Sequence, residues 1–190
     1  MDRVGGRAWF EPRTALVTGA GPIGLLAAMI GVQRGLDVHV LDRVEDGPKP
    51  DLVRDLGATY HTGTISEVLE DGRPDVVIEA TGVGRLVFDA IAETSTYGIV
   101  CLTGVSTGGR MLEVDGGGLN RSIVLENDAL VGSVNANLRH YELAAEALAA
   151  ADPTWLQRLI TTRVPLAEAP DSFGRPPGED VKAVITLGDL

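Results

Sequence analysis

The stretch TALVTGAGPIG, residues 14–24, decides the fold. Its first part, Thr14–Thr18, is rich in β-forming residues and predicts a short strand that is buried on both faces. The rest reads G-x-G-x-x-G, with Gly19, Gly21 and Gly24 as its glycines, and it opens a mostly apolar stretch that predicts a helix. The motif alone is a weak signal in a chain with 24 glycines, but its place between a strand and a helix makes it informative.

Strand-like and helix-like segments alternate on both sides of this stretch. The further predicted strands are Leu36–Asp42, Val76–Ile78, Ile99–Leu102 and Leu130–Val134. The predicted helices are the segment from Gly24 to Gly35 and those over Pro48–Leu56, Leu86–Glu93, Arg139–Ala151 and Pro153–Ile160. This order predicts an α/β fold, a doubly wound parallel sheet of about six strands with right-handed crossovers, known as the Rossmann fold.

The chain divides into three parts by pattern. Residues 1–12 form a connecting segment, residues 13–160 form the Rossmann domain, and residues 161–190 form a helical and extended tail. In the tail, residues 161–166 are extended, and a Pro/Gly-rich loop over 173–178 leads to a final strand over 181–187.

The glycine motif predicts a phosphate-binding turn for a dinucleotide. Gly19 permits the tight turn, Gly21 lets the pyrophosphate approach the backbone, and Gly24 lets the helix pack close to the strand. Pro22 and Ile23 complete the loop, and the helix N-terminus offers free N–H groups and the positive end of its dipole. The alternative is a plain glycine turn between a strand and a helix.

Asp42 ends the second strand, 18 residues after Gly24. A carboxylate there accepts hydrogen bonds from the ribose hydroxyls of NAD and repels the 2′-phosphate of NADP, so the sequence favours NAD. Arg43 follows directly, and its guanidinium could stack on adenine or bind a 2′-phosphate. NADP therefore stays open, as does the reading that Asp42 only caps the next turn.

Two further loops follow strands, at the sheet edge where doubly wound folds bind ligands. The candidate residues after the strand at 76–78 are Ala80, Thr81 and Gly82. Those after the strand at 99–102 are Thr103, Gly104 and Val105. Their glycines would let backbone groups reach the nicotinamide half of the cofactor, although ordinary turns are an equal alternative for any single residue.

Composition excludes several classes of protein. The net charge is 16 − 27 = −11, which disfavours nucleic acid and anionic membranes as partners. No apolar run approaches the about 20 residues of a membrane span, and the first residues lack the apolar core of a signal peptide. A single cysteine, Cys101, forms no disulfide framework and agrees with a cytoplasmic location.

No catalytic or metal-binding set is visible in the sequence. His39, His61 and His140 lie far apart, and none has a ligand spacing to Cys101. His39 and Cys101 are expected to be ordinary strand residues, His140 to begin a helix and Trp155 to pack. Short-chain dehydrogenases are excluded, because no tyrosine is followed four residues later by a lysine.

The motifs together resemble the C-terminal, cofactor-binding half of glucose 1-dehydrogenases in the zinc-dependent medium-chain dehydrogenase superfamily. The resemblance runs from about Arg7 to Leu187 and includes the glycine loop, Asp42-Arg43, and the two loops just described. Its most specific part is LVGSVNAN, residues 130–137, followed by His140 and Tyr141. Members that use NADP often lack the acid found at Asp42.

This resemblance implies a function. Asn135 would lie near the nicotinamide ring and the hydroxyls of a sugar, and an aldose would be oxidised at C1 by hydride transfer to NAD or NADP. A catalytic zinc and its ligands would belong to an N-terminal domain outside this sequence, so the chain would be inactive alone. A homodimer through residues 110–134 is also implied, and the final strand would have to pair differently, be disordered or self-associate.

Two other functions stay open at this point. One is a stand-alone nucleotide-sensing Rossmann module, in which a bound adenine nucleotide shifts the oligomeric state. The other is a domain that binds S-adenosylmethionine through the glycine loop.

Overall fold

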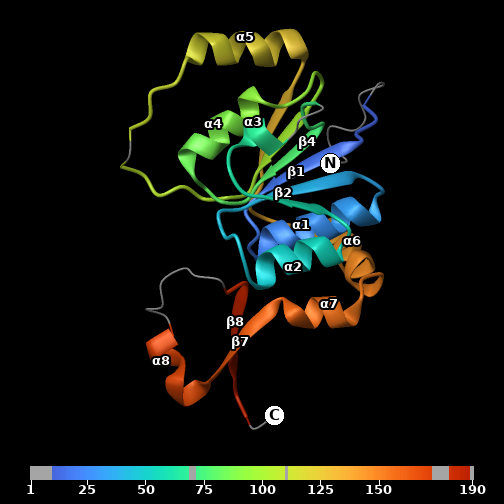
Figure 1. The fold of residues 1–190 in the computed structure, drawn as a ribbon, viewed down its shortest axis with the longest axis vertical. Coiled ribbons are helices and arrows are strands. Elements are labelled where there is room, and N and C mark those ends of the chain that lie inside the picture. Colours follow the sequence, from blue (N-terminus) through green and yellow to red (C-terminus); the bar gives the residue numbers. More distant parts are fainter. Residues whose placement is uncertain (1–9, 69–71, 110, 173–179, 189–190) are drawn as a thin grey trace.

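The computed structural model describes residues 10–68, 72–109, 111–172 and 180–188. Strands and helices alternate along most of the chain (Figure 1). The strands are β1 (Thr14–Thr18), β2 (Asp37–Leu41), β3 (Thr59–His61), β4 (Val76–Glu79), β5 (Ile99–Leu102), β6 (Ala129–Gly132), β7 (Ile160–Pro165) and β8 (Lys182–Thr186). The helices are α1 (Pro22–Gln33), α2 (Pro48–Asp55), α3 (Ile65–Val68), α4 (Gly84–Ala92), α5 (Gly116–Glu126), α6 (Leu138–Ala149), α7 (Pro153–Arg158) and α8 (Ala169–Ser172), with a 3₁₀ turn over Leu166–Glu168.

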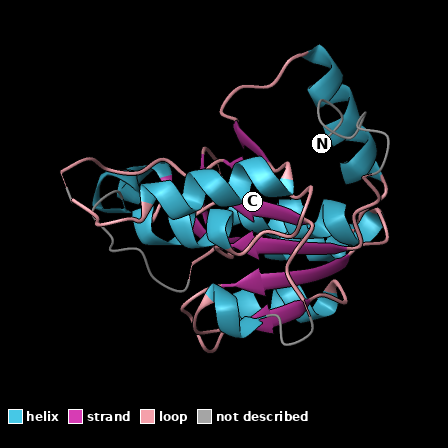
Figure 2. Cartoon of the chain, turned by 90° about the horizontal axis from the view of Figure 1, so that it is seen from above, coloured by secondary structure: helices cyan, strands magenta, loops and turns pink. Residues whose placement is uncertain are grey.

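The first six strands form one parallel sheet in the order β3-β2-β1-β4-β5-β6. Figure 2 shows these strands side by side and pointing the same way. The order reverses direction at β1, which is the switch point of a doubly wound sheet. The predicted fold class, including about six strands, is therefore confirmed.

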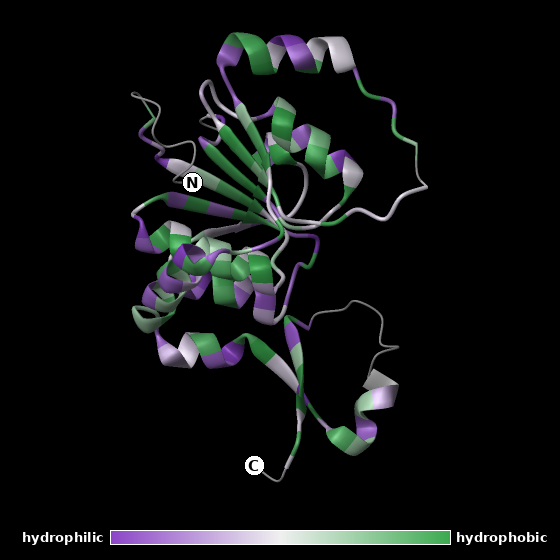
Figure 3. Cartoon of the chain, turned by 180° about the vertical axis from the view of Figure 1, so that it is seen from behind, coloured by the Kyte–Doolittle hydropathy of each residue, from purple (hydrophilic) through white to green (hydrophobic). Residues whose placement is uncertain are grey.

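Each face of this sheet is covered by its own hydrophobic core. On one face, Ala15 and Val17 of β1 pack with Leu25 of α1 and with Leu52 and Val53 of α2. On the other face, side chains from β1, β2, β4 and β5 pack with α3, α4 and α5; the buried members are Leu16, Leu41, Ile65, Val68, Val77, Ala90, Ile91 and Val100. Strands buried on both sides explain the continuous apolar runs of the sequence (Figure 3).

The predicted strands and helices agree with the structure except near their ends. Gly35, with φ of 75°, follows the end of α1 in the left-handed conformation that was predicted for it. The strand predicted over 130–134 ends earlier, because β6 spans Ala129–Gly132 and residues 133–137 belong to no helix or strand. The helix predicted over 153–160 ends at Arg158, and Ile160 already belongs to β7.

Helix α5 was not predicted, because it begins with three glycines, which are poor helix formers. Two features compensate for them. The Asp115 carboxylate accepts a hydrogen bond from the N–H of Gly118 at 2.9 Å and caps the helix. Leu119 and Ile123, four residues apart, both pack on the second core.

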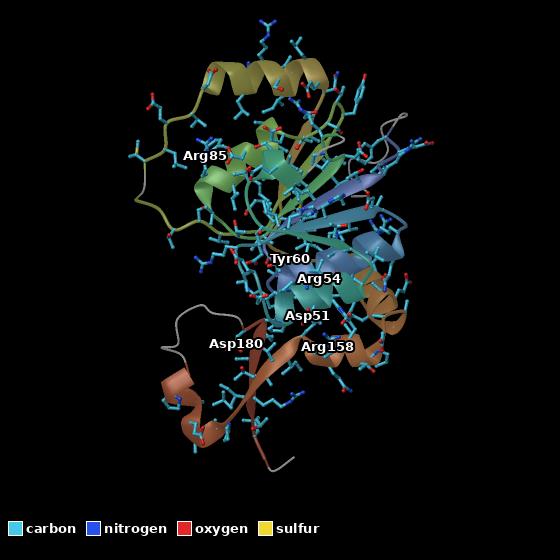
Figure 4. The ribbon with its side chains drawn as sticks, in the orientation of Figure 1. Asp51, Arg54, Tyr60, Arg85, Arg158 and Asp180 are labelled. Carbon is cyan, nitrogen blue, oxygen red and sulfur yellow. The ribbon has the colours of Figure 1, made fainter. Side chains whose placement is uncertain are left out.

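The tail forms a separate two-stranded parallel sheet of β7 and β8. The predicted final strand thus pairs with the extended piece predicted over 161–166, which is one of the three outcomes considered. Helix α7 connects the tail to the domain, since the Trp155 indole donates a hydrogen bond to the Leu52 carbonyl at 2.9 Å. Arg158, labelled in Figure 4, forms an ion pair with Asp55 of α2. Trp155 therefore packs as expected, whereas the loop predicted over 173–178 lies outside the described residues.

Within the described ranges, no helix combines the length and the apolar character that crossing a bilayer requires.

Candidate functional site

The predicted loops meet at the carboxyl ends of the central strands. The Ala20 N–H donates to the Asp42 carboxylate at 2.7 Å, which joins the ends of β1 and β2. A Cβ added at Gly19 would lie 2.9 Å from the Thr81 methyl group, so the loops after β1 and β4 are in contact. A Cβ at Gly82 would lie 2.6 Å from the Val105 carbonyl oxygen. The structure thus gathers four of the five predicted segments in one place.

The three motif glycines meet different surroundings. A Cβ at Gly24 would lie 1.8 Å from the Gly19 carbonyl oxygen, so only glycine allows helix α1 to approach the turn. Gly19 has φ of 95°, a conformation that side chains rarely adopt. A Cβ at Gly21 would meet nothing within 4 Å. Gly21 therefore leaves open space in front of the backbone, as a phosphate site requires.

The N-terminus of α1 faces this open space. Gly21 is its N-cap and Pro22 its first residue; no side chain within the described part of the molecule caps it, and its first turn holds no acid. Unbonded N–H groups at the end of a 12-residue helix attract anions through hydrogen bonds and through the helix dipole. Ile23 is 58% exposed in this first turn, which places an apolar side chain beside the polar groups.

Asp42 is firmly held at the end of β2. Besides Ala20, its carboxylate accepts a hydrogen bond from the Val44 N–H at 3.2 Å, so it does cap the following turn. It also lies 3.5 Å from the Lys49 ammonium group at the start of α2. Arg43 is exposed beside it. The capping role does not exclude a ribose contact, because each carboxylate oxygen accepts more than one hydrogen bond.

Glu79 begins the loop predicted after the strand at 76–78, and its role in this site was not predicted from the sequence. It ends β4 fully buried, and its carboxylate accepts hydrogen bonds from the N–H groups of Thr81 and Gly82 at 2.8 and 3.1 Å. The hydroxyls of Thr81 and Thr18 also donate to it. The sequence does contain a signal for this role, namely an acidic residue at the end of the otherwise apolar run VVIE. A carboxylate that is buried in a strand needs hydrogen-bond donors around it.

The loops after β4 and β5 are locked together through backbone contacts. The N–H groups of Thr103 and Gly104 donate to the Glu79 carbonyl, and Ala80 donates to the Thr18 carbonyl. A Cβ at Gly104 would lie 2.1 Å from the Gly82 nitrogen. These glycines therefore have a packing role, which the sequence analysis did not foresee.

A shallow cavity of about 420 Å³ lies at the ends of β5 and β6. Its lining consists of Leu102, Thr103, Gly104, Val105, Ser106, Gly132, Ser133 and Val134. Val105 and Val134 are 82% and 83% exposed, so apolar side chains border this cavity. Asn135 follows directly in an exposed position, and the cavity lining does not include it.

The histidines and the cysteine take other roles. His140 lies in a reciprocal cap with Asn137 at the start of α6, and Cys101 is half-buried in β5, where burial raises the pKa of its thiol. His39 and His61, distant in sequence, stack with Nδ1 and Nε2 2.8 Å apart. Within the described residues no three His, Cys, Asp or Glu side chains group as metal ligands.

The fold and the glycine turn define a doubly wound nucleotide-binding domain of the dehydrogenase type. Comparison with known proteins makes this specific: residues 1–187 match the family model described as glucose dehydrogenase C-terminus. The chain belongs to this family, as the resemblance implied.

Its relatives are about twice as long. Glucose 1-dehydrogenase 2 of Vulcanisaeta moutnovskia is 37% identical over 188 residues, which are 96% of this chain and 53% of the relative. Glucose 1-dehydrogenase of Halobacterium salinarum is 42% identical over 163 residues, 82% of this chain and 45% of the relative. The chain thus spans about half the length of these curated relatives.

A solved structure shows the same arrangement of elements. The Haloferax mediterranei glucose dehydrogenase, solved in complex with NADP, Zn and gluconolactone, matches all of this chain and 55% of its own. The TM-score is 0.87 and the sequence identity is 28%.

Proposed function

We propose that this chain is the dinucleotide-binding half of an aldose dehydrogenase, with the site at the carboxyl ends of β1, β2, β4, β5 and β6. The observation that carries this proposal is the open backbone at Gly21. Its two partner glycines are needed for packing, whereas Gly21 leaves space in front of an uncapped helix N-terminus. The pyrophosphate of NAD or NADP fits such a turn.

Different residues would bind the remaining parts of the cofactor. Asp42 and Arg43 would face the adenosine ribose, and the locked loops around Thr81, Gly82, Thr103, Gly104 and Val105 would carry the nicotinamide half. Exposed Val105 and Val134 offer apolar surface to the nicotinamide ring, and Asn135 would contact both the ring and the sugar. When bound, the dinucleotide supplies the hydride acceptor.

The reaction would be the oxidation of an aldose at C1, as in the glucose dehydrogenases. We place the zinc ligands and most of the sugar site in the part of the relatives that this chain does not match. This chain alone would then bind the dinucleotide without oxidising sugar, and we expect it to act in the cytoplasm.

Isothermal titration of the chain with NAD and with NADP tests this function. We expect saturable binding of at least one dinucleotide below millimolar concentration. Gly21→Ala should weaken that binding about tenfold or more, because the methyl group occupies the space of the phosphate, while circular dichroism and melting temperature stay unchanged. Gly116→Ala at the start of α5 also adds a methyl group in open space, and it should bind normally.

Failure would be clear in either of two ways. If neither dinucleotide binds at millimolar concentration, the proposed function is wrong. If Gly21→Ala binds as well as the parent chain, the site lies elsewhere.

A further inference from the structure

The carboxylate of Glu79 places a negative charge inside the proposed dinucleotide site. Its side chain is fully buried, and its hydrogen-bond donors are the N–H groups of Thr81 and Gly82 and the hydroxyls of Thr81 and Thr18. An ionised carboxylate only accepts hydrogen bonds, and each of these contacts is of that kind. The four donors are neutral groups, so they stabilise the anion without cancelling its charge.

This carboxylate lies close to the lining of the cavity at the ends of β5 and β6. A Cβ added at Gly104 would lie 2.7 Å from Glu79 Oε2, and Gly104 is one of the residues that line this cavity of about 420 Å³. Because Gly104 has no side chain, the carboxylate approaches the backbone that forms this part of the lining. The N–H groups of Thr103 and Gly104 donate to the Glu79 carbonyl at 2.8 and 3.0 Å, which fixes that backbone in place.

The nicotinamide ring, which our proposal places at this cavity, changes its charge during the reaction. The oxidised ring carries one positive charge, and the hydride that it accepts makes it neutral. A negative charge behind the ring site therefore attracts one redox state of the cofactor and not the other. Since Glu79 is fully buried, water screens this attraction only weakly.

We propose that Glu79 sets the preference of this domain for one redox state of the dinucleotide: its buried carboxylate attracts the cationic ring of the oxidised form and has no such attraction for the neutral ring of the reduced form. The inference rests on the proposed dinucleotide function. It gives Glu79 a role beyond holding the loops, because its charge favours binding of the hydride acceptor and release of the reduced product. By linkage, the same charge makes hydride transfer to the bound ring less favourable by an equal free energy.

Calorimetric titrations with three ligands test this proposal. The ligands are the oxidised dinucleotide that the chain binds, its reduced form, and an analogue in which a flat, neutral benzamide ring replaces the nicotinamide. The parent chain should bind the oxidised form about threefold or more tightly than the benzamide analogue, because only the nicotinamide ring carries a charge for Glu79 to attract. In Glu79→Gln this preference should vanish, and the ratio of the dissociation constants of the oxidised and reduced forms should rise about threefold or more.

Two further variants separate the charge of Glu79 from its structural role. Glu79→Asp keeps the charge on a shorter side chain, so it should weaken the binding of all three ligands but keep the preference for the cationic ring. Glu142→Gln removes a carboxylate from the exposed surface of α6 and should leave all dissociation constants unchanged. Binding of ADP-ribose, which lacks the ring, checks that each variant keeps a folded site.

The outcomes separate this inference from the proposed function. An equal loss of affinity for all three ligands in Glu79→Gln overturns the inference, because Glu79 would then only hold the loops, and so does a preference for the cationic ring that Glu79→Asp loses. If Glu79→Gln does not fold, the parent chain decides, since equal or tighter binding of the benzamide analogue overturns the inference. Absence of binding of any dinucleotide to the parent chain overturns the proposed function itself.

Discussion

Glu79 shows how one buried carboxylate organises the site. Four donors from Thr81, Gly82 and Thr18 converge on it, and its backbone carbonyl holds Thr103 and Gly104. The same residue therefore fixes the loops after both β4 and β5. A buried carboxylate is stable in a protein only when it is hydrogen-bonded, and the Glu79 carboxylate accepts hydrogen bonds from all four of these donors.

Glu79→Gln should destabilise the fold. The side-chain NH₂ group of glutamine would face N–H donors, so at least one buried donor loses its acceptor, and we expect a loss of about 2–3 kcal/mol in the free energy of unfolding. Urea unfolding followed by circular dichroism measures it. The control is Glu142→Gln on exposed α6, which should change stability by less than about 0.5 kcal/mol. Equal stability of the two variants would show that the network around Glu79 is dispensable.

The His39–His61 pair makes stability depend on pH. Burial, and then the neighbouring His39, lower the pKa of His61 below its ordinary value of 6.5. In acid the unfolded chain therefore binds a proton that the folded chain resists, so the free energy of unfolding falls as the pH drops below about 6.5 towards the lowered pKa. Above that range the contribution is fully present.

Urea unfolding between pH 5 and pH 7.5 tests this dependence. His61→Gln should flatten the slope of stability against pH near pH 6, whereas His140→Gln on α6 should keep it. An unchanged slope in His61→Gln would assign the pH dependence to other groups.

Among the elements, the turn from β1 to α1 is the most constrained. The Cβ that Gly24→Ala introduces would lie 1.8 Å from the Gly19 carbonyl oxygen, and backbone atoms cannot yield cheaply. We expect a loss of about 3 kcal/mol or more, or failure to fold, in contrast with the stable Gly21→Ala variant. Melting temperatures of the two purified variants decide this, and equal melting temperatures would contradict the packing role of Gly24.

Prediction from sequence succeeded where local pattern and tertiary packing agree. The glycine turn, the apolar strands and the helix that ends before Gly35 each have a clear local sequence pattern. In each case the packing of the sheet favours the same structure as that pattern. Prediction failed for α5, because a side-chain cap and two partly buried apolar residues, Leu119 and Ile123, outweigh the poor helix propensity of three glycines. The roles of Glu79 and Lys49 were not predicted, because they depend on partners from other elements. These partners are Thr18 for Glu79 and Asp42, at the end of β2, for Lys49.

At the scale of the whole molecule, apolar side chains are exposed on β6 and on α5 and α6, the helices before and after it in the sequence. β6 is an edge strand, and Leu130 on it is 47% exposed. Val124 and Leu125 of α5 are more than 60% exposed, as are Leu138 and Tyr141 of α6. Exposed apolar side chains and an open strand edge favour association with a second copy, and we propose the homodimer that the sequence analysis expects through residues 110–134.

Sedimentation velocity tests this homodimer. The parent chain should sediment with twice the mass of one chain at micromolar concentration, and Val124→Glu/Leu125→Glu should sediment as a monomer, because charges would be buried in the interface. Leu166→Glu, on an exposed apolar residue of the 3₁₀ turn, should stay dimeric. A monomeric parent chain would contradict the proposal.

We expect the amide protons of the separate β7–β8 sheet to exchange with solvent more readily than those of the six-stranded sheet. Two strands alone form a marginal sheet, whereas β1 and β4 lie at the centre of six strands between two cores. The amide protons of Arg163 and Val164 should therefore exchange through local opening of the tail, and those of Leu16 and Val77 only through unfolding of the whole domain. We therefore expect the tail to open locally without disturbing the dinucleotide site that we propose.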